Sequence, residues 1–202
     1  MAVMVGRQAD IYIASGTGTT MTGEATTSLG SGVYRITNSA RRAINPNAAL
    51  TVLDGVTTVN PALYRVSFGA GLIIFTGGYT PAGAVTVTGQ FLTLSQAAQG
   101  TQWSLEVQNT LEDAHVFGDS WKAVQPVQRE STVTFERFYN DEYFHTQGAN
   151  YYVLALYLNT STGARYVMAG QLTSVGRTVD NNALIRENVQ FASHGQVDFL
   201  AS

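Results

Sequence analysis

Short segments of alternating apolar and polar residues recur along almost the whole chain, and few stretches have the apolar spacing of a long helix. Side chains alternate between the two faces of a strand, so this period predicts strands that bury one face. The pairs Asp54-Gly55, Gly77-Gly78 and Thr162-Gly163 are typical of turns between strands. Closely spaced strands of this kind favour a β-sandwich or a β-barrel. We expect strands at residues 9–14, 33–37, 49–53, 63–68, 72–76, 85–94, 101–108, 131–138, 151–159, 165–174, 184–191 and 195–200.

Residues 100–142 combine two of these strands with helix-forming signals between them. Asp113 or Asp119 supplies a helix N-cap before a brief apolar run. Pro126 ends this run, because proline cannot continue a helix. We therefore predict one short α-helix at about residues 113–124. In the strand before it, Trp103, Leu105 and Val107 share one face, and Gln102, Ser104, Glu106 and Gln108 share the other.

Aromatic residues are concentrated in and after this region. Phe117 and Trp121 lie four residues apart, so in a helix they share one face, and we expect Trp121 to anchor the helix on a sheet. The aromatic residues between 135 and 152 suggest stacking on a sugar or a base. No basic stripe accompanies them, and aromatic residues are favoured in strands, so we interpret them as core and interface packing.

Two of the expected strands are apolar on both faces. Residues 153–158 and 72–75 form nearly continuous apolar runs. Such runs are typical of strands that are covered on two sides. In an isolated subunit the second cover would be the short helix, and in an assembly it would be a neighbouring subunit.

The chain shows no clear domain boundary, and we expect a single domain over residues 1–202. Within it, residues 33–94 form either an inserted β-subdomain or an elaborated hairpin region. Residues 17–32 are small and polar with several glycines, so they have the composition of a linker. We interpret them as a disordered arm or as a loop that becomes ordered only on assembly.

Charge is sparse in this chain. Charged residues make up 12% of it, whereas 45% of the residues are hydrophobic. Soluble domains carry about 25% charged residues, and the buried centre of subunit interfaces is depleted of Lys, Glu and Asp. Either the exterior is neutral and polar, or much of it becomes subunit interface. The formal net charge of −3 and the scattered basic residues argue against stable binding to nucleic acid.

No group of residues in the sequence is arranged for chemistry. The chain contains no cysteine, which excludes disulfides, thiolate catalysis and cysteine-based metal sites. His115, His145 and His194 are too dispersed to form a zinc motif. The carboxylate neighbours Glu112-Asp113 and Asp141-Glu142 point to different faces, and we interpret both pairs as solvated turns. We expect no enzymatic activity, no catalytic, cofactor-binding or metal site, and no cofactor.

The N-terminal residues lack the features of a targeting segment. The stretch MAVMVGRQADIYIAS has neither the basic region nor the continuous apolar region of a signal peptide. No window approaches the ~18 apolar residues that a membrane helix needs. We therefore expect the protein to be made in a cytoplasm and to act without a membrane partner.

Two blocks of the chain contain phrases that occur in a characteristic order. The second block contains WSL at 103–105, VFGDSWK at 116–122 and STVTFE at 131–136, and the first contains VYRITN at 33–38, LTVLDG at 50–55 and YTPAGAVTVTG at 79–89. Together they resemble the major tail tube proteins of bacteriophages with long, non-contractile tails, the siphovirus type.

This resemblance implies a mainly β tail-tube fold with one short helix. It further implies hexameric rings in which the sheets of six copies close into a continuous inner β-barrel, leaving no free strand edge. The rings stack head to tail into the hollow tail tube of the virion. The implied partners are further copies of the chain, a tape-measure protein, the tail terminator and tail-tip proteins. DNA passes through the lumen on its way to the host without stable binding.

A second hypothesis comes from a different class of function. A small β-sandwich binding module, such as a carbohydrate- or receptor-binding decoration of the virion, has a similar size and strand content. The two hypotheses differ in assembly: a tube subunit forms rings and tubes at high concentration, and a binding module stays a monomer or a small closed oligomer.

Overall fold

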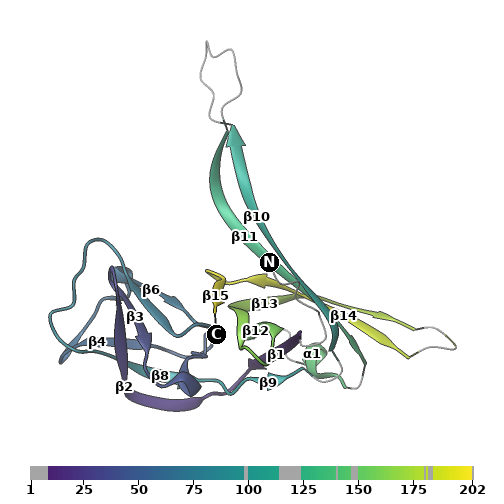
Figure 1. Ribbon diagram of the computed structural model, residues 1–202, viewed down its shortest axis with the longest axis horizontal. Coiled ribbons are helices and arrows are strands. Elements are labelled where there is room, and N and C mark those ends of the chain that lie inside the picture. The colour runs from purple at the N-terminus through teal and green to yellow at the C-terminus, as the bar shows by residue number, and fades with distance from the viewer. Residues whose placement is uncertain are drawn as a thin grey trace, which may run out of the picture.

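The computed structural model describes residues 9–97, 100–113, 124–139, 141–146, 150–179, 181 and 184–201. Within these residues the chain is almost entirely β-structure, arranged as an eight-stranded sheet and a seven-stranded sheet that lie side by side (Figure 1). The expectation of a mainly β fold is confirmed. Each strand predicted from the sequence has a counterpart in the structure.

The larger sheet contains the C-terminal half of the chain together with the first strand. Its strands are β1 (Asp10–Ser15), β9 (Ser95–Gln96), β10 (Gly100–Asp113), β11 (Val124–Phe138), β12 (Tyr151–Asn159), β13 (Ala164–Thr178), β14 (Arg186–Ser193) and β15 (Asp198–Leu200). Their order is β10-β11-β14-β13-β12-β1-β9, with β15 paired to β13. All of these pairings are antiparallel.

The core of the larger sheet is rich in aromatic side chains. Phe135 and Phe191 come from β11 and β14, and Tyr152 comes from β12. Phe144, from the short helix α1 (Tyr143–Thr146), packs edge to face against Phe135 with the ring centroids 5.5 Å apart. This geometry is favourable for aromatic pairs. One turn of helix therefore contributes a central residue to the core.

The smaller sheet has its own core and is formed by the N-terminal part of the chain. Its strands are β2 (Thr19–Gly30), β3 (Val33–Ile36), β4 (Thr51–Asp54), β5 (Thr57–Thr58), β6 (Tyr64–Ser67), β7 (Leu72–Phe75) and β8 (Val85–Phe91). Their order is β5-β4-β8-β2-β3-β7-β6. Two turns of 3-10 helix, Ser39–Arg41 and Pro61–Leu63, lie in its loops. Residues 33–94 supply every strand of this sheet except β2.

β12 is the strand that connects the two cores. Leu154 and Leu156 point into the core of the larger sheet. Val153 and Ala155 lie on the opposite face, where they pack against small side chains such as Ala43 and Ala70 from loops of the smaller sheet. The strand is thus covered on two sides, as the sequence predicts. The second cover is the smaller sheet of the same chain, and not the short helix or a neighbouring subunit.

The interpretation of residues 17–32 as a linker or disordered arm is wrong. Residues 19–30 form β2, which pairs with β8 and with β3. Its threonines are β-branched and suit a strand. Gly23 has a positive φ of 58° where the register with β8 shifts, so the glycine there accommodates a bulge.

The expected helix at 113–124 lies largely outside the described residues. Its two ends are strand residues, because Asp113 at the end of β10 pairs with Val124 at the start of β11. Phe117 and Trp121 are not among the residues that the structure describes. Nowhere in the described chain is a helix both long and apolar enough to cross a membrane.

Candidate assembly surface

Four neighbouring strands of the larger sheet, β10, β11, β14 and β13, form a section with two unpaired edges; we call it the four-strand section. Among the described residues β10 pairs only with β11. On the other side, β12 pairs with β13 up to Gln171, and residues 172–178 have no partner strand in the described chain on that side. Unpaired N–H and C=O groups along a strand edge are a template for another strand. The section is therefore open to pairing at both edges.

The two faces of the four-strand section differ sharply. On the covered face, the central rows across the sheet are apolar, as in the row of Trp103, Phe135, Val189 and Val175. On the open face, the rows are polar. These rows contain Gln102, Glu136, Asn188 and Gly176, then Ser104, Thr134, Gln190 and Ser174, then Glu106, Thr132, Ala192 and Gln171. The alternation that the sequence shows for residues 102–108 continues across all four strands.

The open face carries few charges, and they are mostly acidic. Glu106 and Glu136 are its carboxylates in the rows above, and Arg186 is the basic residue beside them. The Arg186 guanidinium donates to the Glu136 carboxylate over 2.7 Å, and the Gln102 amide donates to the same carboxylate over 3.0 Å. Apart from Gly176 and Ala192, the other side chains of these rows are uncharged amides and hydroxyls. Such a face is well hydrated and offers little attraction to a polyanion.

Beyond the sheet, β10 and β11 continue as a two-stranded ribbon. β14 pairs with β11 only from Thr132 onward, whereas β10 and β11 stay paired as far as Asp113 and Val124. At ~3.3 Å per residue the ribbon extends roughly 20 Å past the sheet. Figure 1 shows it projecting almost at a right angle to the long axis of the body.

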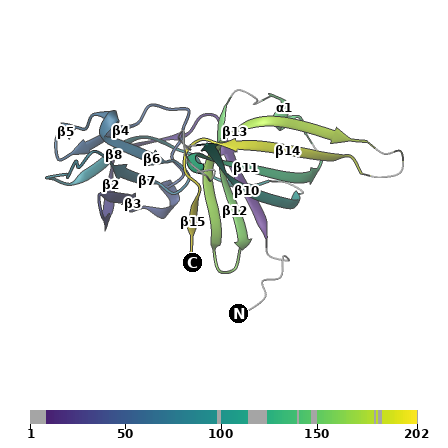
Figure 2. The ribbon, with the colours of Figure 1, turned by 90° about the horizontal axis from the view of Figure 1, so that it is seen from above.

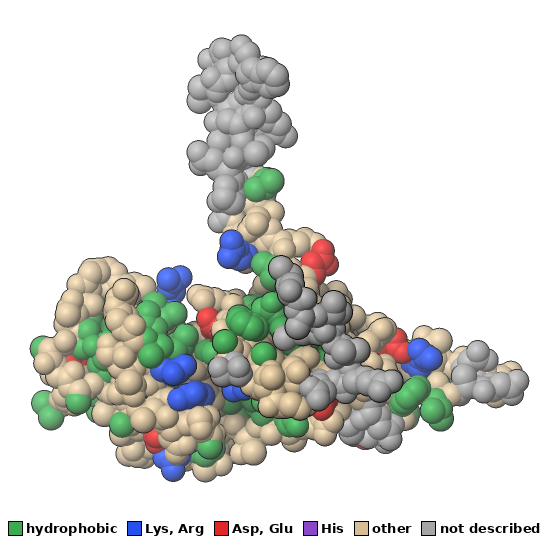
Figure 3. Space-filling view, viewed as in Figure 1, with side chains coloured by type: hydrophobic (Ala, Val, Ile, Leu, Met, Phe, Trp, Pro, Cys, Tyr) green, Lys and Arg blue, Asp and Glu red, His purple; other side chains and the backbone are tan. Residues whose placement is uncertain are grey.

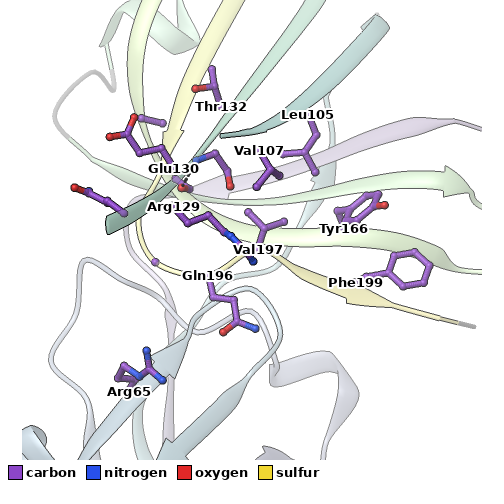
Figure 4. Close-up of a pocket in the computed structure, with 15 residues that line it drawn as sticks. Arg65, Leu105, Val107, Arg129, Glu130, Thr132, Tyr166, Gln196, Val197 and Phe199 are labelled. Carbon is purple, nitrogen blue, oxygen red and sulfur yellow. Dashed lines mark hydrogen bonds between the residues drawn. The ribbon is translucent and has the colours of Figure 1, made fainter. Parts of the chain in front are cut away.

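An open groove of about 970 Å³ lies at the base of the ribbon. Its apolar lining comes from β10, from β13 and from the segment that contains β15, and Arg65 of the smaller sheet reaches its rim (Figure 4). In the space-filling view, apolar side chains gather at the ribbon's base and charged ones are sparse elsewhere on this face (Figure 3). The apolar lining is Leu105, Val107, Tyr166, Val197 and Phe199.

A network of ion pairs lies at the end of the covered face. Glu187 is fully buried on β14, and its carboxylate accepts from Arg137 over 2.6 Å and from Arg177 over 3.3 Å. Arg137 also binds Asp141, and Arg177 binds Glu142 over 2.7 Å. The network joins β11, β13 and β14 to the segment that leads into α1. Burying a carboxylate is tolerated because two guanidinium groups compensate its charge.

Glu142 makes this network sensitive to acid. Hydrogen bonds from Arg177 and then Tyr139 lower the pKa of the Glu142 carboxyl from 4.5 to about 2. Since the pKa is depressed in the folded state, the stabilisation is complete above pH 4.5 and is lost as the pH falls towards 2. We expect the difference in the free energy of unfolding between the wild type and Glu142→Gln, measured in urea, to be constant above pH 4.5. The difference should shrink as the pH falls below 4.5. A difference that does not change with pH would contradict this assignment.

The other residues considered for chemistry remain apart. His145 lies in α1 and His194 follows β14, where its ring contacts Tyr151, and His115 is outside the described residues. The described chain contains no cluster of His, Asp and Glu that could hold a metal ion. The Asp54 carboxylate stabilises a turn, because it accepts hydrogen bonds from the backbone amides of Ala82 and Gly83 and from the Tyr79 hydroxyl. The two amide hydrogen bonds lower the pKa of the Asp54 carboxyl.

The interpretation of the pair Asp141-Glu142 as a solvated turn is incomplete, because both carboxylates bind arginines. Glu112-Asp113 ends β10, so this pair lies in a strand and not in a turn. The buried Glu187 was missed altogether. Its signal was present: Glu187 occupies the same strand parity as Val189 and Phe191, so the alternation places its carboxylate in the core.

No protein-family model matches the chain, and no curated protein sequence matches it. Among solved structures, it is similar to a chain from the tail of an empty gene transfer agent particle with C6 symmetry, at 13% identity and a TM-score of 0.45. The match covers 54% of this chain and 87% of that one. A chain from the virion of the native gene transfer agent particle gives 13% identity and a TM-score of 0.44, over 54% of this chain and 89% of the other.

Proposed function

We propose that this protein is a structural subunit of a phage-like tail, which forms hexameric rings that stack into a hollow tail tube for DNA delivery. Its role is to assemble, and we infer no enzymatic activity. The observation that carries the proposal is the four-strand section, with two unpaired edges, one covered apolar face and one open polar face.

The direction of the strands makes lateral closure straightforward. Neighbouring strands of the section are antiparallel throughout, so β10 and β13 run in opposite directions. If β13 of one copy pairs with β10 of the next, the new pairing is also antiparallel. The same pairing repeated around a ring removes every free edge of the section, which is the benefit of a closed barrel.

The size of such a barrel suits a DNA channel. Six copies contribute four strands each; at a strand spacing of about 4.8 Å and a tilt of about 40°, the backbone wall is about 48 Å across. The covered face packs on the subunit body, so the open polar face lines the lumen. Amides and hydroxyls, with few and mainly acidic charges, let DNA pass without binding.

The ribbon of β10 and β11 provides the axial contact in this proposal. It projects from the body, and Val107 and Leu111 on it are half-exposed or more. In a stack of rings it extends to the next ring and buries these side chains there. At the ends of the tube, ribbons or grooves are exposed because no further ring covers them. The tape-measure, terminator and tip proteins would then bind to a tube with such ends.

Concentration-dependent assembly tests the proposal. Purified protein should form rings, and then tubes, in negative-stain images and in sedimentation as its concentration rises. The competing hypothesis of a small β-sandwich binding module predicts a monomer or a closed small oligomer at every concentration. That outcome would reject the tail-tube function.

The composition of the open face also leads to a prediction about whether assembled tubes bind DNA. We expect assembled tubes to show no measurable affinity for duplex DNA at physiological salt, because acidic and neutral groups give no release of counterions. Thr134→Lys with Gln190→Lys places two cations per subunit on this face. Tubes of that variant should bind DNA with an affinity that falls steeply with salt. Equal binding by wild-type and variant tubes would contradict the assignment of this face to the lumen.

A further inference from the structure

A small pocket lies beside the unpaired edge of β10, at the start of that strand. Its volume is about 270 Å³. One wall is Ala9, Asp10 and Ile11 at the start of β1. The other wall is the first four residues of β10, from Gly100 to Trp103. The pocket therefore opens at the edge where the proposed ring places a neighbouring copy.

Trp103 leaves one polar group unsatisfied next to this pocket. Its ring packs against the core of the larger sheet. Its indole N–H is buried and has no hydrogen-bond acceptor among the described residues. Buried donors are nearly always paired in native structures, so an acceptor from outside the described chain is expected here.

The strand directions identify what lies opposite. When β13 of a neighbour pairs antiparallel with β10, the end of that β13 comes next to the start of β10. The described residues that flank the β13–β14 turn there are Val179 and Leu184, which are 69% and 68% exposed. These are large exposed apolar side chains at the tip of a hairpin, which Figure 2 shows reaching away from the body. Exposed apolar tips of this kind are typical of interfaces.

The charges on the two sides are complementary. Asp10 lies on the rim of the pocket, and its carboxylate bonds only to the Ile11 amide and the Gln96 side chain among the described residues. The hairpin that carries Val179 and Leu184 also carries Arg186, which is well exposed. Arg186 is already paired with Glu136 of its own copy, so its charge adds a long-range attraction towards Asp10 and not a new ion pair.

We propose that the pocket beside Trp103 receives the apolar end of the β13–β14 hairpin of the neighbouring copy, with Leu184 or Val179 as the inserted side chain. A backbone carbonyl of that hairpin accepts the Trp103 indole N–H. The inference rests on the proposed ring and adds the contact that sets its register. Each subunit then carries the pocket at its β10 edge and the hairpin that fills the neighbour's pocket at its β13 edge.

Cysteine cross-linking tests this contact directly, because the chain has no cysteine of its own. Thr101→Cys and Val179→Cys are prepared separately, mixed, assembled and oxidised. We expect a disulfide-linked dimer that contains one copy of each variant. The control pairs Thr101→Cys with Val56→Cys, whose site is 99% exposed on the smaller sheet, and it should give only background cross-linking. If rings form but the cross-link between Thr101→Cys and Val179→Cys does not, the contact is overturned and the proposed function is not. If no rings form, both the contact and the proposed function are overturned.

Trp103 fluorescence gives a second test that separates the neighbour from the chain's own N-terminus. The chain has two tryptophans, so Trp121→Phe leaves Trp103 as the reporter. We expect its emission to shift to the blue on assembly and the shift to be lost when Leu184→Asp is added. Deleting residues 1–8 should leave the emission of the monomer unchanged. A change in that monomer would mean that the N-terminal residues fill the pocket, and would overturn the proposal.

Discussion

Replacing Glu187 with alanine is expected to destabilise the subunit by about 3–5 kcal/mol, the usual cost of removing one partner from a buried ion pair. The Glu187 carboxylate is fully buried, and Arg137, which bonds to it, is only 3% exposed. Without the carboxylate, the buried guanidinium loses its buried charge partner, although it keeps the half-exposed carboxylate of Asp141. The measurement is the free energy of unfolding in urea, taken on the unassembled protein.

Glu136→Ala is the matched control. Glu136 lies on the adjoining strand with its side chain 16% exposed, and its partner Arg186 is 59% exposed on the open face. Exposed ion pairs contribute about 0–1 kcal/mol, so this variant should stay within that range of the wild type. Similar losses for Glu187→Ala and Glu136→Ala would show that the buried network has no special role in stability.

Shortening the ribbon is expected to abolish tubes while leaving the subunit folded. Replacing residues 110–128 with Asn-Gly joins Asn109 to Arg129, which face each other in β10 and β11, through a two-residue hairpin turn. The removed part makes no pairing with β14, so the core of the larger sheet stays intact. The expected product in electron micrographs is single rings, because the axial contact is gone.

Leu111→Ser serves as a milder companion to this deletion. Leu111 is 58% exposed on the ribbon, so its loss should cost the isolated subunit less than about 0.5 kcal/mol. It should nevertheless raise the concentration needed for tubes. If the shortened chain formed normal tubes, the axial contact would have to lie on a surface other than the ribbon.

The positions of the strands could be predicted because their alternation is local. The sequence placed β12 at its observed bounds and found the starts of β10 and β3 within one residue. The lengths of β10 and β11 were underestimated, since their outer parts pair only with each other and carry little apolar alternation. β2 was missed because its glycines and small polar residues resemble a linker, and one of its two partners, β8, is distant in the sequence.

The assembly surface was less visible in the sequence. The alternation of Trp103 and Leu105 with polar neighbours indicated one buried and one open face. It did not show which strands lie beside β10, because that depends on pairings between distant segments such as β11 with β14. For the same reason the smaller sheet was not anticipated as the second cover of β12.

The most direct test of the whole account is an electron cryo-microscopy reconstruction of tubes grown from concentrated purified protein. We predict six subunits per ring and a continuous antiparallel barrel in which β13 of one copy pairs with β10 of the next. The face with Thr134, Gln190 and Asn188 should line the lumen. A protein that stays monomeric at high concentration, or tubes with that face on the outside, would contradict the account.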